Sequence, residues 1–162
     1  MRKFHKKAQV NILDLIIALS IALILIVAIM ISWDRFAIKL GKKTLQNDLQ
    51  VIAFQLSDQL LSNTGTPVNW ETNTSNISSL GLAIEDRILS RNKVLNFTMI
   101  NYDTIKSLLN IENYWFNFNL SYLDENQVVF VGTPANGSYV VNIRRLVRYD
   151  NRTAQVKISI WK

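Results

Sequence analysis

The chain has 162 residues, 49% of them apolar, with no cysteine and a single histidine, His5. The absence of cysteine excludes a disulfide framework, a thiolate metal site and a cysteine nucleophile. The net charge is +6, but four of the 18 basic residues lie within the first seven positions, and the other 14 stand against 12 acidic residues. Because the excess of basic residues is concentrated at the N-terminus and the rest of the chain is nearly balanced in charge, the sequence lacks the basic patch of a nucleic-acid-binding domain. We therefore expect no nucleic-acid partner.

An apolar run occupies Leu15 to Trp33, where Ser20 and Ser32 are the only polar residues among 19. As a helix rising about 1.5 Å per residue, the run is about 28 Å long, which matches the hydrocarbon core of a bilayer. It exceeds the roughly 7–15 apolar residues of a secretory signal, and no small-residue cleavage pattern follows it. The sequence therefore predicts a retained membrane helix, with Trp33 at the headgroup level.

The orientation of this helix is not decided by its flanking charges, because four basic residues precede it and four follow it closely. The sequence contains six N-x-S/T sequons, where 17 asparagines and 21 serines and threonines predict roughly two by chance. We therefore expect the N-terminus inside the cell and a glycosylated C-terminal domain outside. The alternative is that these residue types cluster because all of them favour turns. The sequons are at Asn73, Asn76, Asn96, Asn119, Asn136 and Asn151.

Asp14 places a carboxylate directly before the apolar run. Such a group costs about 2.5–3.5 kcal/mol near the bilayer centre and usually has a partner, although in the interface the cost is small. If the chain were cut after Ala8, Gln9 would carry a new ammonium group. The ammonium of a neighbouring chain could then neutralise Asp14 in a dry interface between helices.

The N-terminal sequence Arg-Lys-Phe-His-Lys-Lys-Ala-Gln-Val, followed by an acid and a long aliphatic run, resembles the class III signal peptide of archaeal type IV pilin-like proteins. The resemblance covers about residues 3–35. It implies that a membrane prepilin peptidase cleaves between Ala8 and Gln9, after the basic pair Lys6-Lys7. It also implies that the helix then packs with other pilin subunits in a filament core, with Gln9 and Asp14 taking part in assembly.

Two positions depart from the family pattern. The family often has serine at the third mature position, where this chain has Asn11, and an acid at the fifth, where it has Leu13. The acid, Asp14, comes one place later, and this shift bears on the docking role of Asp14 more than on cleavage.

The predicted organisation is a cleaved basic leader over 1–8, a transmembrane or filament-core helix over 9–33, an amphipathic continuation over 34–63 and an extracellular globular domain over 64–162. Gly41 leaves open whether the first helix is continuous or hinged, because glycine costs about 1 kcal/mol in a helix interior. The apolar stripe of the continuation consists of Leu45, Leu49, Ile52, Leu56 and Leu60, widened by Val51, Ala53 and Leu61.

The middle of the domain shows mixed patterns. Two short helices are expected to follow the N-caps Ser90 and Asn101. Trp70 is interpreted as a core anchor rather than a sugar platform. The segment Glu85-Asp86-Arg87 is interpreted as a solvated helix face.

The C-terminal third has the two-residue period of strands over 114–122, 139–143 and 154–160, and a short apolar run over 128–131. Arg144-Arg145 breaks this period, which predicts a bulge or a strand end. The predicted fold class is α+β and type IV pilin-like: the long helix packed on an antiparallel meander of about four strands.

No phosphate-binding loop, dinucleotide fingerprint or zinc-protease helix is present in the sequence. We therefore expect no enzyme activity, cofactor or metal. The leading hypothesis is a membrane-anchored precursor of a major or minor subunit of an archaeal type IV pilus-like surface filament, whose partners are prepilin peptidase, other pilin subunits and the membrane. The alternative is an uncleaved single-pass membrane protein with an extracellular binding domain.

Overall fold

The computed structural model describes the backbone of residues 4–124 and 127–162, and the side chains of 12–74, 76–124 and 127–162. The chain divides between Leu45 and Gln46 into two compact units. The first residues of the expected leader, 1–3, and most of the turn expected at 124–126 lie outside the described residues.

Helix α1 (Phe4–Ser62) is assigned without interruption through Gly41. A β-carbon added at Gly41 would meet no atom within 4 Å, so the glycine serves no close packing contact in the described chain. The helix ends at Ser62, and Gly65, three residues later, takes a left-handed φ of 81°. No proline occurs before Pro67. Of the two alternatives left open at Gly41, the structure contains the uninterrupted helix.

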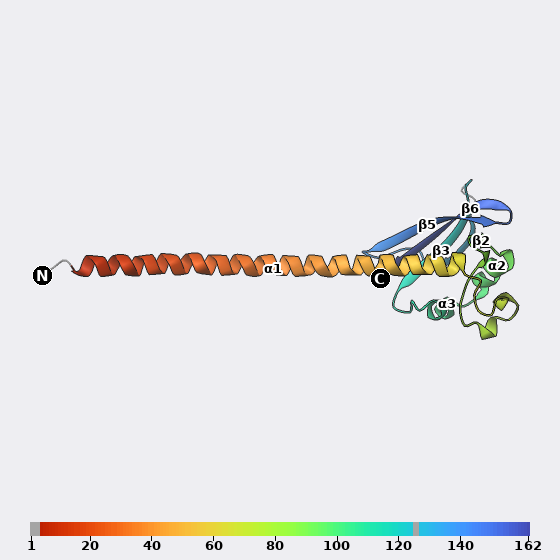
Figure 1. The fold of residues 1–162 in the computed structure, drawn as a ribbon, viewed down its shortest axis with the longest axis horizontal. Helices are drawn as coiled ribbons and strands as arrows, with labels where there is room; N and C mark the ends of the chain where they lie inside the picture. The colour runs from red at the N-terminus through yellow and green to blue at the C-terminus, as the bar shows by residue number, and fades with distance from the viewer. Residues whose placement is uncertain (1–3, 125–126) are drawn as a thin grey trace. The chain divides into compact units, whose positions relative to one another are not determined.

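The last turns of α1, from Gln46 onward, belong to the second unit and present an apolar face to its core. The stripe prediction is confirmed at most positions, because Leu49, Ala53, Leu56 and Leu60 are at most 2% exposed. Val51 was wrongly included and is 55% exposed. Figure 1 shows the strands of the sheet alongside these yellow turns of α1.

The second unit contains one six-stranded mixed sheet with the strand order β1-β2-β5-β6-β3-β4. The α+β class is confirmed, and the predicted antiparallel meander of about four strands is matched in part. The four long strands pair antiparallel, but β6 lies between β5 and β3, and two short strands bring the sheet to six. The residues of β6 from Ile158 to Trp161 are buried on both faces, which suits the centre of a sheet rather than its edge. The strands are β1 (Ala83–Glu85), β2 (Ile88–Leu89), β3 (Trp115–Tyr122), β4 (Gln127–Gly132), β5 (Val140–Tyr149) and β6 (Arg152–Trp161).

The strand break expected at Arg144-Arg145 does not occur, and β5 continues in unshifted register with β6. Arg145 takes an inward position because its guanidinium reaches the end of α1. Its Nε donates a 3.2 Å hydrogen bond to Ser57 Oγ, and its Nη2 lies 3.7 Å from Asp58 Oδ1. Position 145 faces inward, where the two-residue period would place an apolar residue, and it holds an arginine because Ser57 and Asp58 supply polar partners.

The segment Glu85-Asp86-Arg87 is a strand end and turn between β1 and β2, so its interpretation as a helix face is wrong. Strands β1 and β2 are too short to show a two-residue alternation in the sequence. Backbone hydrogen bonds to distant parts of the chain hold them in place. The amide of Arg87 donates to Leu61 O at 3.0 Å, and its carbonyl accepts from the amide of Arg148 at 2.8 Å.

The two predicted helices are present as α2 (Arg91–Met99) and α3 (Tyr102–Leu108). Ser90 and Asn101 cap them as predicted, accepting hydrogen bonds from the amides of Lys93 and Asp103. Two 3₁₀ turns, Trp70–Thr72 and Thr74–Asn76, precede the sheet. Trp70 is fully buried and its Nε1 donates a 2.8 Å bond to Gly81 O, which confirms it as a core residue.

Candidate functional site

The first unit exposes a continuous apolar helix surface. From Ile12 to Leu40, its large apolar side chains are between 45% and 70% exposed. The helix is long and apolar enough to cross a membrane, with a mean hydropathy of 3.1 in its most apolar window. A surface of this size and composition requires an apolar environment, from lipid or from other helices.

The two serine hydroxyls within the apolar run Leu15 to Trp33 are hydrogen-bonded locally. Ser20 Oγ donates to Ile16 O and Ser32 Oγ donates to Ala28 O, each at 2.8 Å. Both hydroxyls therefore bond within the helix and need no water, which is the condition for placing them in lipid or in a dry helix interface.

Asp14 lies on this helix with an exposed side chain. Among the residues whose side chains the structure describes, no cation lies within ion-pair distance of its carboxylate. The predicted cleavage residues Lys6, Lys7, Ala8 and Gln9 fall within the bounds of α1, and their side chains are outside the described set. The structure therefore places the backbone of the cleavage segment in a helix.

A hollow of about 480 Å³ marks the end of the apolar surface that lies nearer the second unit in sequence. The small residues Ala28 and Ser32 form its floor, between larger side chains one turn before and after. Small residues let a neighbouring helix approach closely in a membrane or bundle. Sequence reasoning missed this hollow, although the spacing of two small residues at i and i+4 would have indicated it. Its lining is Leu25, Ala28, Ile29, Ser32, Trp33 and Phe36.

The six sequons differ in their surroundings. Asn73, Asn76, Asn136 and Asn151 are exposed, and Asn96 is half-buried on α2. Asn119 lies inside β3, which is paired on both sides, and its Oδ1 is buried without a hydrogen-bond partner in the described structure. The sequons therefore do not form one equivalent set of acceptor sites.

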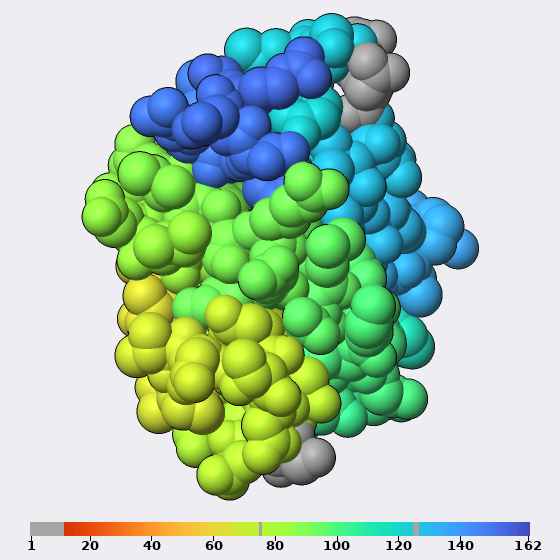
Figure 2. All heavy atoms as spheres, turned by 90° about the vertical axis from the view of Figure 1, so that its right-hand side faces the viewer, coloured from red at the N-terminus to blue at the C-terminus, as the bar shows by residue number. Residues whose placement is uncertain are grey.

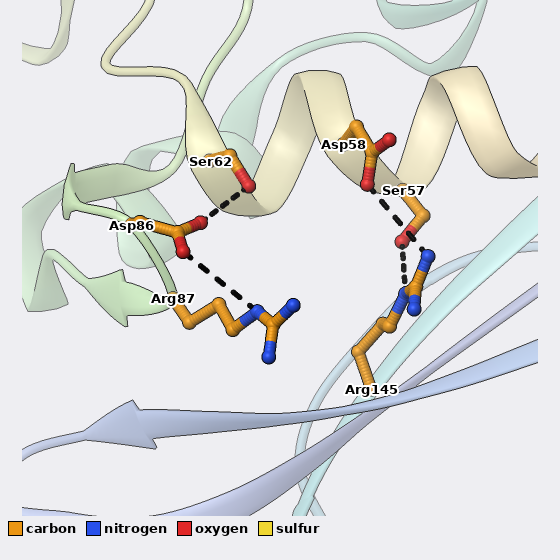
Figure 3. A network of polar contacts seen from close by, with 6 residues as sticks. All are labelled: Ser57, Asp58, Ser62, Asp86, Arg87 and Arg145. Atoms are coloured by element: carbon orange, nitrogen blue, oxygen red, sulfur yellow. Dashed lines mark hydrogen bonds and ion pairs between the residues drawn. The ribbon is translucent and has the colours of Figure 1, made fainter.

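A polar network in the second unit joins the end of α1 to the β1–β2 turn and to β5 (Figure 3). Ser62 Oγ donates a 2.6 Å hydrogen bond to Asp86 Oδ1, and Asp86 Oδ2 lies 3.9 Å from Arg87 Nε. From the sequence alone, Asp86 and Arg87 are interpreted as part of a solvated helix face. Their neighbours on α1 and β5 come from distant parts of the chain, so no local signal identified the network.

Lys93 and Lys106 are buried cations of the second unit, and Lys93 is the more deeply buried, with 4% of its surface exposed. Burial lowers the pKa of its ammonium group, while the nearby carboxylate of Glu71 raises it. Its Nζ donates to Thr64 O at 2.6 Å and to Ala83 O at 3.3 Å. These two bonds give the ammonium a structural role, tying α2 to the segments on either side of the Trp70 loop.

No cluster of three or more histidine, cysteine or acidic side chains suited to a metal ion occurs in the described part of the chain. No protein-family model matches this chain, and neither a curated protein nor a solved structure shows significant similarity to it.

Proposed function

We propose that this protein is a structural subunit, major or minor, of a type IV pilus-like surface filament of the archaeal kind. The observation that carries the proposal is the apolar surface from Ile12 to Leu40, exposed along one helix that is followed by a β-sheet domain. Such a helix is stable in a bilayer before assembly and against the helices of other subunits after it.

In this proposal, a prepilin peptidase removes residues 1–8 and frees the amino group of Gln9. The helix then leaves lipid for a bundle of like helices, and the ammonium of a neighbouring subunit neutralises Asp14. The exposed Asp14 carboxylate, without a cation among the described side chains, supports an intermolecular partner. The sheet domain faces the outside of the cell and carries glycans.

The deciding experiment is mass spectrometry of the N-terminus in the membrane and filament fractions of the source cells. We expect mature chains that begin at Gln9, and we expect Ala8→Leu to block this maturation because the peptidase requires a small residue there. An intact N-terminus in both fractions would instead indicate the single-pass anchor with an external binding domain. Loss of the whole apolar helix would indicate a secretory signal.

Asp14→Ala separates processing from assembly. We expect normal cleavage but reduced incorporation into filaments, since the variant lacks the carboxylate that the ammonium of a neighbour would meet. Asp34→Ala, at the other end of the apolar run, is the matched control and should assemble normally. Equal incorporation of both variants would remove the docking role of Asp14 and leave the processing result intact.

A further inference from the structure

Strand β5 has an open edge. On one side it pairs with β6 along its whole length, whereas on the other side β2 covers only Arg148 and Tyr149. Among the described residues, no strand pairs with residues 140–147 on that side. The edge of a sheet presents backbone donors and acceptors in a row, ready to pair with another extended chain.

The direction of the open backbone groups follows from one hydrogen bond. The amide of Arg148 donates to Arg87 O at 2.8 Å, and therefore faces the side on which β2 lies. The register of β5 with β6 has no shift, so amides two residues apart point the same way. The amides and carbonyls of Leu146 and Arg144 consequently face the open edge.

The edge is basic. Arg144, Leu146 and Arg148 alternate with the inward-facing residues of β5, and all three are exposed. Within the described structure neither Arg144 nor Arg148 forms an ion pair, and the Nη2 of Arg148 donates to the neutral Oδ1 of Asn151 at 3.1 Å. A second copy of β5 would bring like charges together, whereas an acidic segment would complement them.

A pocket of about 540 Å³ lies at the end of this edge, between residues 146–148 of β5 and residues 86–88 of the β1–β2 turn. Figure 2 looks onto this end of the domain, where dark-blue residues of the β5–β6 hairpin lie beside the bright-green segment that contains β1 and β2. Three arginines and only one carboxylate contribute to the pocket. The arginines are Arg87, Arg148 and Arg152, and the carboxylate is Asp86.

Arg87 is held in an unusual backbone conformation beside the pocket. Its φ is 60°, a left-handed value that glycine and asparagine adopt far more readily than arginine. Hydrogen bonds from its amide to Leu61 O and from the Arg148 amide to its carbonyl fix the backbone on both sides. Glycine would adopt this backbone conformation with less strain, so we infer that the guanidinium of Arg87 has a role in the pocket.

We propose that the open edge of β5 binds an extended acidic segment of a partner protein as an added strand. The segment pairs with the backbone of Arg144 and Leu146 and places alternate side chains on the outward face. One acidic side chain lies opposite Arg144 and an apolar one lies opposite Leu146. At the end of the segment, where β2 begins, a second carboxylate enters the pocket and meets the guanidinium groups of Arg87 and Arg148. This site does not depend on cleavage after Ala8 or on filament assembly.

The test uses the full chain in detergent micelles and a labelled peptide, acetyl-Glu-Thr-Val-Thr-Glu-amide. Fluorescence anisotropy measures affinity, and hydrogen exchange measures protection of the amides of Leu146 and Arg144. We expect saturable binding with slowed exchange at both amides. Arg148→Gln should weaken the affinity about fivefold through loss of one charge pair. Lys162→Gln, whose ammonium lies over the Tyr114 ring beyond the end of β6 that pairs with Val140, should not change it.

Two further variants address the backbone and the apolar contact. Leu146→Pro removes a donor that faces the open edge and should abolish binding, provided that circular dichroism shows an intact fold. Leu146→Glu keeps every backbone donor, should fold as an exposed strand residue, and should repel the acidic peptide. Normal binding by Leu146→Glu contradicts the predicted pairing, whatever the outcome for the proline variant.

Three results would overturn the proposal. The first is equal binding of the matched lysine peptide, acetyl-Lys-Thr-Val-Thr-Lys-amide. The second is binding without protection of the Leu146 and Arg144 amides, with full displacement by inorganic phosphate, which would indicate a simple anion site. The third is failure of the acidic peptide to bind while oligogalacturonate binds in a manner that requires Arg148, which would indicate a carbohydrate ligand.

Discussion

The ammonium of Lys93 lies 2.6 Å from the carbonyl oxygen of Thr64 and bonds across 29 residues of sequence. The same group donates to Ala83 O at 3.3 Å. Between these two carbonyls the chain forms the loop that holds Trp70, the largest fully buried side chain of the domain. One cation therefore fixes both ends of a long connection against helix α2.

Replacing Lys93 with methionine should destabilise the second unit. The variant keeps the apolar stem but leaves two carbonyl oxygens in a buried region without their donor, at a cost of about 1–3 kcal/mol. Urea unfolding followed by tryptophan fluorescence measures the change. Lys157→Met, at a half-buried position of β6, is the control and should change the free energy of unfolding much less. Equal effects would show that loss of any lysine, rather than of these bonds, is responsible.

Arg145→Met tests the contact between β5 and the end of α1. The variant loses the 3.2 Å bond to Ser57 Oγ and the ion pair with Asp58, whose side chain is largely exposed. Because solvent screens that ion pair, we expect a loss of only about 1 kcal/mol. Arg144→Met, next in sequence but on the outward face, should stay within about 0.5 kcal/mol of the wild type. The same unfolding measurement compares the two, and a larger loss for Arg144→Met would contradict the assigned faces.

Gly81→Ala should be among the most damaging small substitutions. An added β-carbon would lie 2.2 Å from Asn63 O and 2.5 Å from the amide nitrogen of Gly65, both of them backbone atoms that cannot move alone. Overpacking of this kind costs about 1–3 kcal/mol. Gly41→Ala is the matched control, because its β-carbon meets nothing within 4 Å. The denaturation midpoint of the second unit should fall for the first variant and not for the second.

We expect the stability of the second unit to depend on alkaline pH because of the buried phenol of Tyr149. Burial raises the pKa of its phenol, partly offset by Arg91, and the side chain is 4% exposed. Above about pH 10 the unfolded chain ionises this group while the folded protein keeps it protonated, so stability falls as pH rises. Tyr149→Phe removes the phenol and its contribution to the pH dependence of stability. The free energy of unfolding of the variant, measured from about pH 9 to 11, should therefore fall less steeply than that of the wild type. Parallel curves would contradict the raised pKa.

The glycan prediction can be refined by exposure. We expect occupancy at Asn73, Asn76 and Asn136, three of the four exposed sites, and none at Asn119, because Asn119 lies inside β3 with its Oδ1 buried. Glycopeptide mapping of the natural protein measures occupancy site by site. A glycan at Asn119 would mean that β3 is not paired as described. Bare side chains at Asn73, Asn76 and Asn136 would remove the argument for an extracellular domain.

The sequence by itself determined the features whose signals are local. The apolar run from Leu15 to Trp33 is visible as composition, and the buried face of α1 is visible as helical spacing at Leu49, Leu56 and Leu60. The caps Ser90 and Asn101 also follow from short-range chemistry, because a side-chain oxygen satisfies amides only two or three residues away.

Tertiary structure alone decided how those elements combine. The place of β6 between β3 and β5, the two short strands of the β1–β2 hairpin and the inward position of Arg145 depend on partners many residues away. A two-residue period identifies a strand and its faces but carries no information about which strand pairs with it. The basic edge of β5 therefore had no sequence signal: it exists because the fold leaves one side of that strand uncovered and brings Arg87 beside Arg148.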